Sequence, residues 1–201
     1  MAATPAKVRS VCVYCGSSNA ADPAFLEAAA QFGRLLAADG RRLVYGGGRI
    51  GLMGAAGEAA HTAGGKVLGV IPEFLCREEI VYDAVKTVVV KSMHERKLRM
   101  FDESDAFAVL PGGIGTLEEV VELTSWARLG LHRKPIVFLN LAGYWEPYFA
   151  LIRHTVEHHL SPAWIETTWR SVDRTEDVLP MLDLMAATAD EEGSEDVVKF
   201  T

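Results

Sequence analysis

The chain has 201 residues, of which 49% are hydrophobic and 23% charged, which suits one compact domain with a sizeable core. Its formal net charge of −7 argues against a general affinity for nucleic acid, and no apolar run approaches the roughly 20 residues of a membrane span. Residues 1–9 lack the apolar core of a signal peptide, which predicts a cytoplasmic protein that binds neither nucleic acid nor membrane.

The first half of the chain alternates apolar runs with helical patterns. Strands are predicted over residues 8–15, 42–45, 66–71 and 85–90, and helices over residues 23–38, 52–63 and 93–103. Asp22 and Pro23 suit the N-cap and first position of the first helix, which Gly40 ends. Cys12 falls inside a strand, so we interpret Cys12 and Cys15 as small apolar residues of a sheet rather than as a redox pair.

The second half of the chain continues the alternation. Strands are predicted over residues 106–110 and 135–139, and helices over residues 116–129, 144–158 and 175–187. Such alternation is typical of βαβ units and a parallel sheet. We therefore predict an α/β protein with a Rossmann-like, doubly wound, mostly parallel sheet in a single domain over residues 8–187. Residues 1–7 are predicted to form a frayed N-terminus and residues 188–201 a flexible acidic tail.

Ligands of doubly wound sheets bind at the carboxyl ends of the strands, where three loops of this chain carry small or polar residues. Gly16 and Ser17 follow the first strand. After the second strand, the stretch 46–51 matches G-x-G-x-x-G, and Glu73 follows about as far on as the acidic residue of a dinucleotide site. This match keeps an NAD-dependent oxidoreductase open, although a single match is weak evidence and this one does not follow the first strand.

The third loop, Pro111 to Glu119, is the most informative stretch of the sequence. Its three glycines and Thr116 stand between a strand and a helix, where backbone N–H groups and the helix dipole favour an anion. Glu118 and Glu119 follow within one helical turn. The glycines alone would also suit a plain turn between strand and helix, but the Gly-Thr-x-x-Glu continuation favours a functional site. A phosphate cradle beside a carboxylate predicts chemistry on a nucleotide and not only its binding.

Arg96 and Lys97 lie near the start of the preceding helix, where positive charge is unfavourable to the helix dipole. A bound anion would explain them, since arginine chelates phosphate through two parallel hydrogen bonds. A solvated basic face is the alternative, because Arg99 follows three residues after Arg96.

Four motifs together resemble the LOG family, the cytokinin riboside 5′-monophosphate phosphoribohydrolases, also labelled lysine decarboxylases. They are Cys15-Gly16-Ser17-Ser18, the stretch 45–54, Met93-His94-Glu95-Arg96-Lys97 and the loop 111–119, and the resemblance spans about residues 8–184. It implies a Rossmann-like fold, usually a homodimer, and hydrolysis of a nucleoside 5′-monophosphate to free base and ribose 5-phosphate. No organic cofactor or metal is expected, and no lysine has the context of a pyridoxal-phosphate site.

Carried onto matching positions, the resemblance implies Arg96 and Glu119 as catalytic residues. The expected substrate-binding residues are Gly16, Ser17, Glu78, Met93, Arg96, Lys97, Gly112, Gly113, Ile114, Gly115, Thr116, Leu117, Glu118 and Thr124. After Glu78 the chain lacks the Gly-Glu-Thr-Val-Gly segment of plant members, which leaves the preferred base open. A non-catalytic module that binds AMP-type nucleotides is the main alternative function.

Overall fold

The computed structural model describes residues 8–76 and 81–196, with only the backbone for residues 190–196. Seven strands form one sheet in the order β4-β3-β2-β1-β5-β6-β7, and every neighbouring pair is parallel. Their bounds are β1 Ser10–Tyr14, β2 Arg42–Tyr45, β3 Lys66–Pro72, β4 Lys86–Val90, β5 Ala106–Val109, β6 Ile136–Leu139 and β7 Arg170–Val172. The predicted single-domain α/β fold is confirmed.

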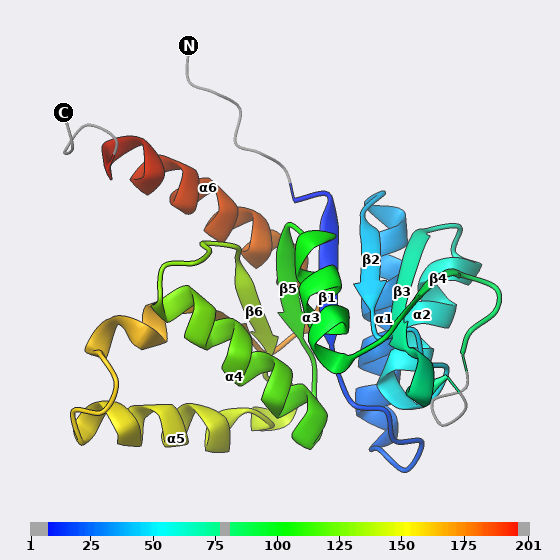
Figure 1. The fold of residues 1–201 in the computed structure, drawn as a ribbon, viewed down its shortest axis with the longest axis horizontal. Coiled ribbons are helices and arrows are strands. Elements are labelled where there is room, and N and C mark those ends of the chain that lie inside the picture. The colour runs from blue at the N-terminus through cyan, green and yellow to red at the C-terminus, as the bar shows by residue number, and fades with distance from the viewer. Residues whose placement is uncertain (1–7, 77–80, 197–201) are drawn as a thin grey trace.

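Helices cover both faces of this sheet (Figure 1). One face carries α1 (Pro23–Ala38), α2 (Gly51–Thr62) and α6 (Val178–Asp196), and the other carries α3 (Met93–Asp102), α4 (Ile114–Arg128) and α5 (Glu146–Glu157). Each layer closes a separate apolar cluster, with Phe32 and Leu43 in the first and Phe107 and Phe138 in the second. Burial on both faces explains why the central strands are apolar throughout.

Local signals place several helix ends where the sequence predicts them. Helix α1 has the predicted bounds, and the Asp22 side chain accepts a hydrogen bond of 2.8 Å from the Ala24 amide. Gly40 follows with φ at +71°, a conformation that favours glycine. Ser92 caps α3 by accepting a hydrogen bond of 3.1 Å from the Glu95 amide.

Two features differ from the sequence-based expectation. Strand β7 is not predicted, because a three-residue edge strand with Arg170 and Ser171 exposed has no apolar run. Helix α6 continues to Asp196 and so passes the helix end predicted at residue 187. Alanine and glutamate, both good helix formers, dominate residues 186–192 and explain the extension. Residues 1–7 lie outside the described residues.

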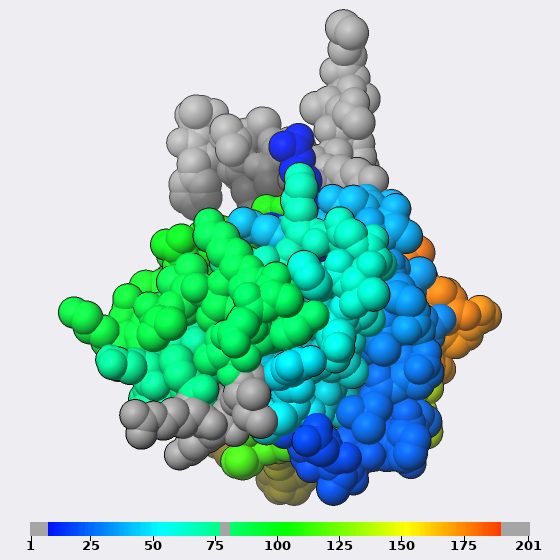
Figure 2. Space-filling model, turned by 90° about the vertical axis from the view of Figure 1, so that its right-hand side faces the viewer, coloured from blue at the N-terminus to red at the C-terminus, as the bar shows by residue number. Residues whose placement is uncertain are grey.

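The chain reverses its direction of sheet growth at β1. Strands β2, β3 and β4 add on one side of β1, whereas β5, β6 and β7 add on the other. The strand arrows in Figure 1 point to its lower edge, where the loops after β1 and β5 lie on either side of this switch point. Figure 2 shows the side of the molecule that α1, α2 and α3 form around the β3 and β4 edge.

Candidate functional site

Hydrogen bonds join the three predicted loops at the switch point between β1 and β5. The Gly16 amide donates to the carbonyl of Pro111 at 3.0 Å, and the Gly16 carbonyl accepts from the Leu52 amide at 2.9 Å. The Asn19 side chain accepts from the Gly51 amide at 2.8 Å, which ties the first loop to the start of α2 a second time. Loops that are far apart in the sequence thus form one connected rim at the carboxyl ends of the strands.

The N-terminus of α4 presents backbone N–H groups on this rim. Gly113 is the N-cap, and no side chain of the described residues caps this end. A Cβ atom on Gly113 or Gly115 would meet no described atom within 4 Å, so the space in front of this turn is open. On Gly112, by contrast, a Cβ would lie 2.2 Å from Oγ1 of Thr116, so glycine there lets the buried Thr116 fold over the loop. This arrangement can hold an anion.

Arg96 reaches from α3 to the ends of two neighbouring strands. Its side chain is buried, with Nε donating to the Val70 carbonyl at 3.2 Å and an Nη atom donating to the Gly46 carbonyl at 3.1 Å. The other Nη atom lies 3.9 Å from the sulfur of Met93. Arg96 is therefore not part of a solvated basic face, which was the sequence-based alternative.

Lys97 joins α3 to α4 through carboxylates of the protein. Its Nζ atom lies 2.5 Å from Oε1 of Glu118 and 3.0 Å from Oε2 of Glu122. Burial opposes the charge of this ammonium, but the hydrogen bonds to the two carboxylates outweigh burial and raise the pKa of Lys97. These carboxylates, rather than a bound anion, compensate the cost of placing Lys97 near a helix N-terminus.

The charges of Glu119 and Arg96 both influence the pKa of Cys12, a buried thiol of β1. Burial is the main cause that raises the pKa of Cys12, the negative charge of Glu119 raises it further, and the positive charge of Arg96 opposes the rise. Glu119 is half-buried on α4, whereas Arg96 is buried on α3. The two residues expected to be catalytic thus lie on two helices that the pairs of Lys97 with Glu118 and Glu122 join. The fully buried, high-pKa thiol fits the non-redox interpretation of Cys12.

The other residues expected to bind substrate differ in exposure and in their distance from the loop. Ser17 is exposed on the first loop, and Ile114 is 83% exposed at the start of α4. Leu117 packs against the core beneath α4. Thr124 lies about 12 Å along α4 from Thr116, and its hydroxyl donates to the Val120 carbonyl at 2.9 Å, so the structure does not bring it to the loop. Glu78 lies outside the described residues.

Tyr144 is a rim residue that the sequence does not single out. Its hydroxyl donates a hydrogen bond of 2.7 Å to the carbonyl of Gly112, and its ring meets that of Phe25 edge-on at 5.2 Å. The only sequence signal is an aromatic residue a few positions after β6. That position becomes informative once the neighbouring strands β5 and β6 are known to place their loops side by side.

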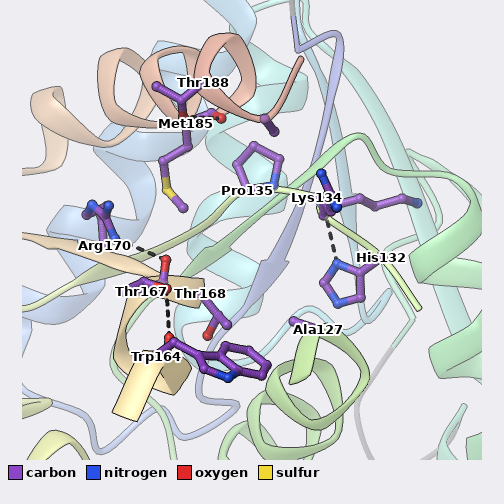
Figure 3. Close-up of a pocket in the computed structure, with 12 residues that line it drawn as sticks. Ala127, His132, Lys134, Pro135, Trp164, Thr167, Thr168, Arg170, Met185 and Thr188 are labelled. Atoms are coloured by element: carbon purple, nitrogen blue, oxygen red, sulfur yellow. Dashed lines mark hydrogen bonds between the residues drawn. The ribbon is translucent and has the colours of Figure 1, made fainter. Parts of the chain in front are cut away.

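A separate cavity of about 380 Å³ lies at the opposite end of the sheet (Figure 3). Pro135, just before β6, and Arg170, at the start of β7, line it together with Trp164 and Met185. It shares no residue with the rim described above. In the part of the chain that the structure describes, no cluster of three or more His, Cys, Asp or Glu residues could hold a metal ion. No helix there is long and apolar enough to cross a membrane.

A family model described as possible lysine decarboxylase matches residues 53–182. The chain is 45% identical over 164 residues to the Arabidopsis thaliana protein named cytokinin riboside 5′-monophosphate phosphoribohydrolase LOG7, covering 81% of this chain and 76% of that protein. It is 47% identical to a rice protein named probable cytokinin riboside 5′-monophosphate phosphoribohydrolase LOGL9 (78% and 69% covered). A further rice relative, LOGL3, is 40% identical, with 90% of each chain covered.

Solved structures resemble the fold at lower sequence identity. The molybdenum cofactor binding protein of Rippkaea orientalis superposes with a TM-score of 0.66 at 22% identity, covering 90% of this chain and 99% of that one. A Moco carrier protein of Chlamydomonas reinhardtii gives 0.67 at 20% identity, with 89% and 98% covered. At this identity the likeness is evidence for the fold alone.

Proposed function

The chain belongs to the LOG family, and on that premise we propose that it hydrolyses the N-glycosidic bond of nucleoside 5′-monophosphates such as isopentenyladenosine monophosphate or AMP. Water adds across the bond between C1′ of the ribose and the base, giving ribose 5-phosphate and the free base. The observation that carries the proposal is the N-terminus of α4, which no side chain of the described residues caps, with Glu119 about one helical turn further on.

In this proposal the 5′-phosphate binds the amides of the loop Gly112 to Thr116. The phosphate then fixes the ribose against Glu119, whose carboxylate orients the water and stabilises the oxocarbenium-like transition state. Arg96 orients the nucleotide or assists departure of the base, and the leaving base takes up a proton. Lys97, paired with Glu118 and Glu122, positions α3 against α4.

The test is to incubate the protein with AMP and with isopentenyladenosine monophosphate and to measure the free base released. Glu119→Gln should lower turnover by about 100- to 1000-fold, because one electrostatic contact of the transition state is lost. AMP affinity should change little, and Glu157→Gln on the exposed side of α5 should behave as wild type. Near-wild-type release of base by folded Glu119→Gln would defeat the assignment.

A wild-type protein that binds AMP without releasing base would instead be a nucleotide-binding module. The oxidoreductase alternative has less support, because Arg96 occupies the space in front of Gly46 in the G-x-G-x-x-G stretch. Titration with NAD(H) tests it directly. The hydrolysis requires water as its only co-reactant, so we propose no cofactor, and we propose the cytoplasm as its location.

We also propose a homodimer formed through α3 and α4. Val120 and Leu123 of α4 are buried in the core, but Val121 and Leu129 are 51% and 57% exposed. Leu98 on α3 is 44% exposed. These exposed apolar side chains lie on the two helices that a second copy of the chain would cover.

A further inference from the structure

We propose that Gly46, the first glycine of the Gly46-Gly47-Gly48 triplet, is a positioning residue for Arg96: its missing side chain leaves the space that the guanidinium occupies. The inference rests on the proposed function, in which Arg96 acts on the bound nucleotide. The Gly-rich stretch 46–51 resembles a dinucleotide-binding motif, but in this proposal its first glycine makes room for an arginine.

The space around Gly46 is taken by two side chains. An ideal Cβ atom on Gly46 would lie 2.0 Å from an Nη atom of Arg96 and 2.7 Å from the sulfur of Met53. The first distance is far inside van der Waals contact, and both Gly46 and Arg96 are buried in close-packed surroundings. Any side chain at position 46 would therefore displace the head of Arg96.

Conformation does not explain the glycine at this position. The φ angle of Gly46 is not positive, whereas Gly47 and Gly51 adopt φ of +81° and +60°. Alanine could adopt the backbone of Gly46 without strain, and only space excludes it. Gly51 has a second reason of its own, since a Cβ there would lie 2.4 Å from the amide nitrogen of Ser18.

The backbone of the same residue also orients the guanidinium. The carbonyl of Gly46, after β2, and the carbonyl of Val70, in β3, each accept one hydrogen bond from Arg96. Two acceptors on neighbouring strands fix both the position and the plane of the rigid fork. Gly46 thus contributes a carbonyl that holds Arg96 and an absent side chain that admits it.

The experiment is a double-mutant cycle between Gly46→Ala and Arg96→Ala, with kcat and KM measured for AMP. Gly46→Ala should lower kcat by about 100-fold, because small displacements of a catalytic group have effects of this size. The double variant should be no slower than Arg96→Ala alone. Gly57→Ala on α2 is the matched control: its Cβ would lie 2.9 Å from the ring of Tyr45, so it should lower Tm but keep the wild-type kcat.

Chemical rescue is a second measurement, and a purely structural role of Gly46 would not affect it. Free guanidinium should restore part of the activity of Arg96→Ala, and the methyl group of Ala at position 46 should abolish this rescue by filling the vacated space. Wild-type kcat in Gly46→Ala, multiplicative losses in the cycle, or equal rescue in both backgrounds would overturn the proposal.

Thermal unfolding separates this inference from the proposed function. Gly46→Ala should lower Tm in the wild-type background, where Arg96 blocks the methyl group, and much less in the Arg96→Ala background. An inactive wild type with this Tm pattern would refute the hydrolase but keep the packing relation. Equal Tm losses in both backgrounds would refute the packing relation even if the enzyme is active.

Discussion

Thr116 stands in the first turn of α4, buried and folded over Gly112. If this loop holds the 5′-phosphate, remote binding energy positions the ribose, so AMP should be hydrolysed with a far higher kcat/KM than adenosine. Thr116→Ala should lower kcat/KM for AMP by about 10- to 100-fold, the range for one hydrogen bond to a charged group, and leave adenosine unchanged. Equal kcat/KM of the wild type for AMP and adenosine would contradict phosphate binding by this loop, and its glycines would then only form a turn.

His132 should make stability depend on pH. Burial is the main cause that lowers the pKa of His132 below its ordinary value of 6.5, and the charge of Lys134 lowers it further. The ring accepts a hydrogen bond at Nδ1 from the Lys134 amide, drawn in Figure 3, and its Nε2 lies 3.0 Å from the Leu123 carbonyl. The neutral form with a proton on Nε2 fits both contacts.

The unfolded chain therefore protonates His132 first as the pH falls through 6.5, and the native state loses stability below that value. His132→Gln should be less stable than wild type at neutral pH but should lose less Tm between about pH 7 and pH 5. Parallel Tm curves for the two proteins across this interval would contradict the prediction.

Single residues differ in how far sequence alone could place them. The caps Asp22 and Ser92 were predictable, because each bonds an amide two or three residues away. The partners of Arg96 could not be predicted, because Gly46 is 50 positions away and is brought close only by the sheet. Tyr144 was missed for the same reason, since its contact with Gly112 spans 32 positions.

At the scale of elements, a buried arginine fastens α6 to the sheet. Arg41, just before β2, donates to the two carboxylate oxygens of Asp183 on α6 at 2.9 and 2.6 Å, and to Asp39 at 2.5 Å. Asp183→Asn should lower the free energy of unfolding by about 1.5–3 kcal/mol in urea denaturation, since the guanidinium stays buried.

The matched control for this ion pair is Glu27→Gln. Its pair with Arg34 lies in solvent on α1, so its loss should cost about 0–1 kcal/mol. A loss from Asp183→Asn no larger than that from Glu27→Gln would show that the buried position of Arg41 adds nothing.

Strands and helices were predictable where periodicity is strong and both faces are buried, as in β1, β2 and α1. Strand β7 was not, because its residues gain their structure from pairing with β6 rather than from an apolar pattern of their own. Helix α6 continues beyond its predicted end at residue 187, because acidic composition is typical of a tail but glutamate also favours helix.

For the whole molecule, the exposed apolar side chains of α3 and α4 predict a dimer at micromolar concentration in light scattering. Val121→Glu should yield a monomer, because a carboxylate would be buried without a partner in the interface. Leu160→Glu is the control, since Leu160 is also exposed (82%) but lies beyond α5. A monomeric wild type would contradict the dimer directly.

The central place of β1 has a consequence for biosynthesis. Of the seven strands in this sheet, β1 leaves the ribosome before the other six, and β2 pairs with one of its edges soon afterwards. Its other edge waits for β5, where the ladder begins beside Asp105, 95 positions after Ser10. At about 5–20 residues per second, that edge stays unpaired for about 5 to 20 seconds of translation. During this interval a strand built for the protein interior is open to other nascent chains, so slow translation before residue 110 should favour aggregation.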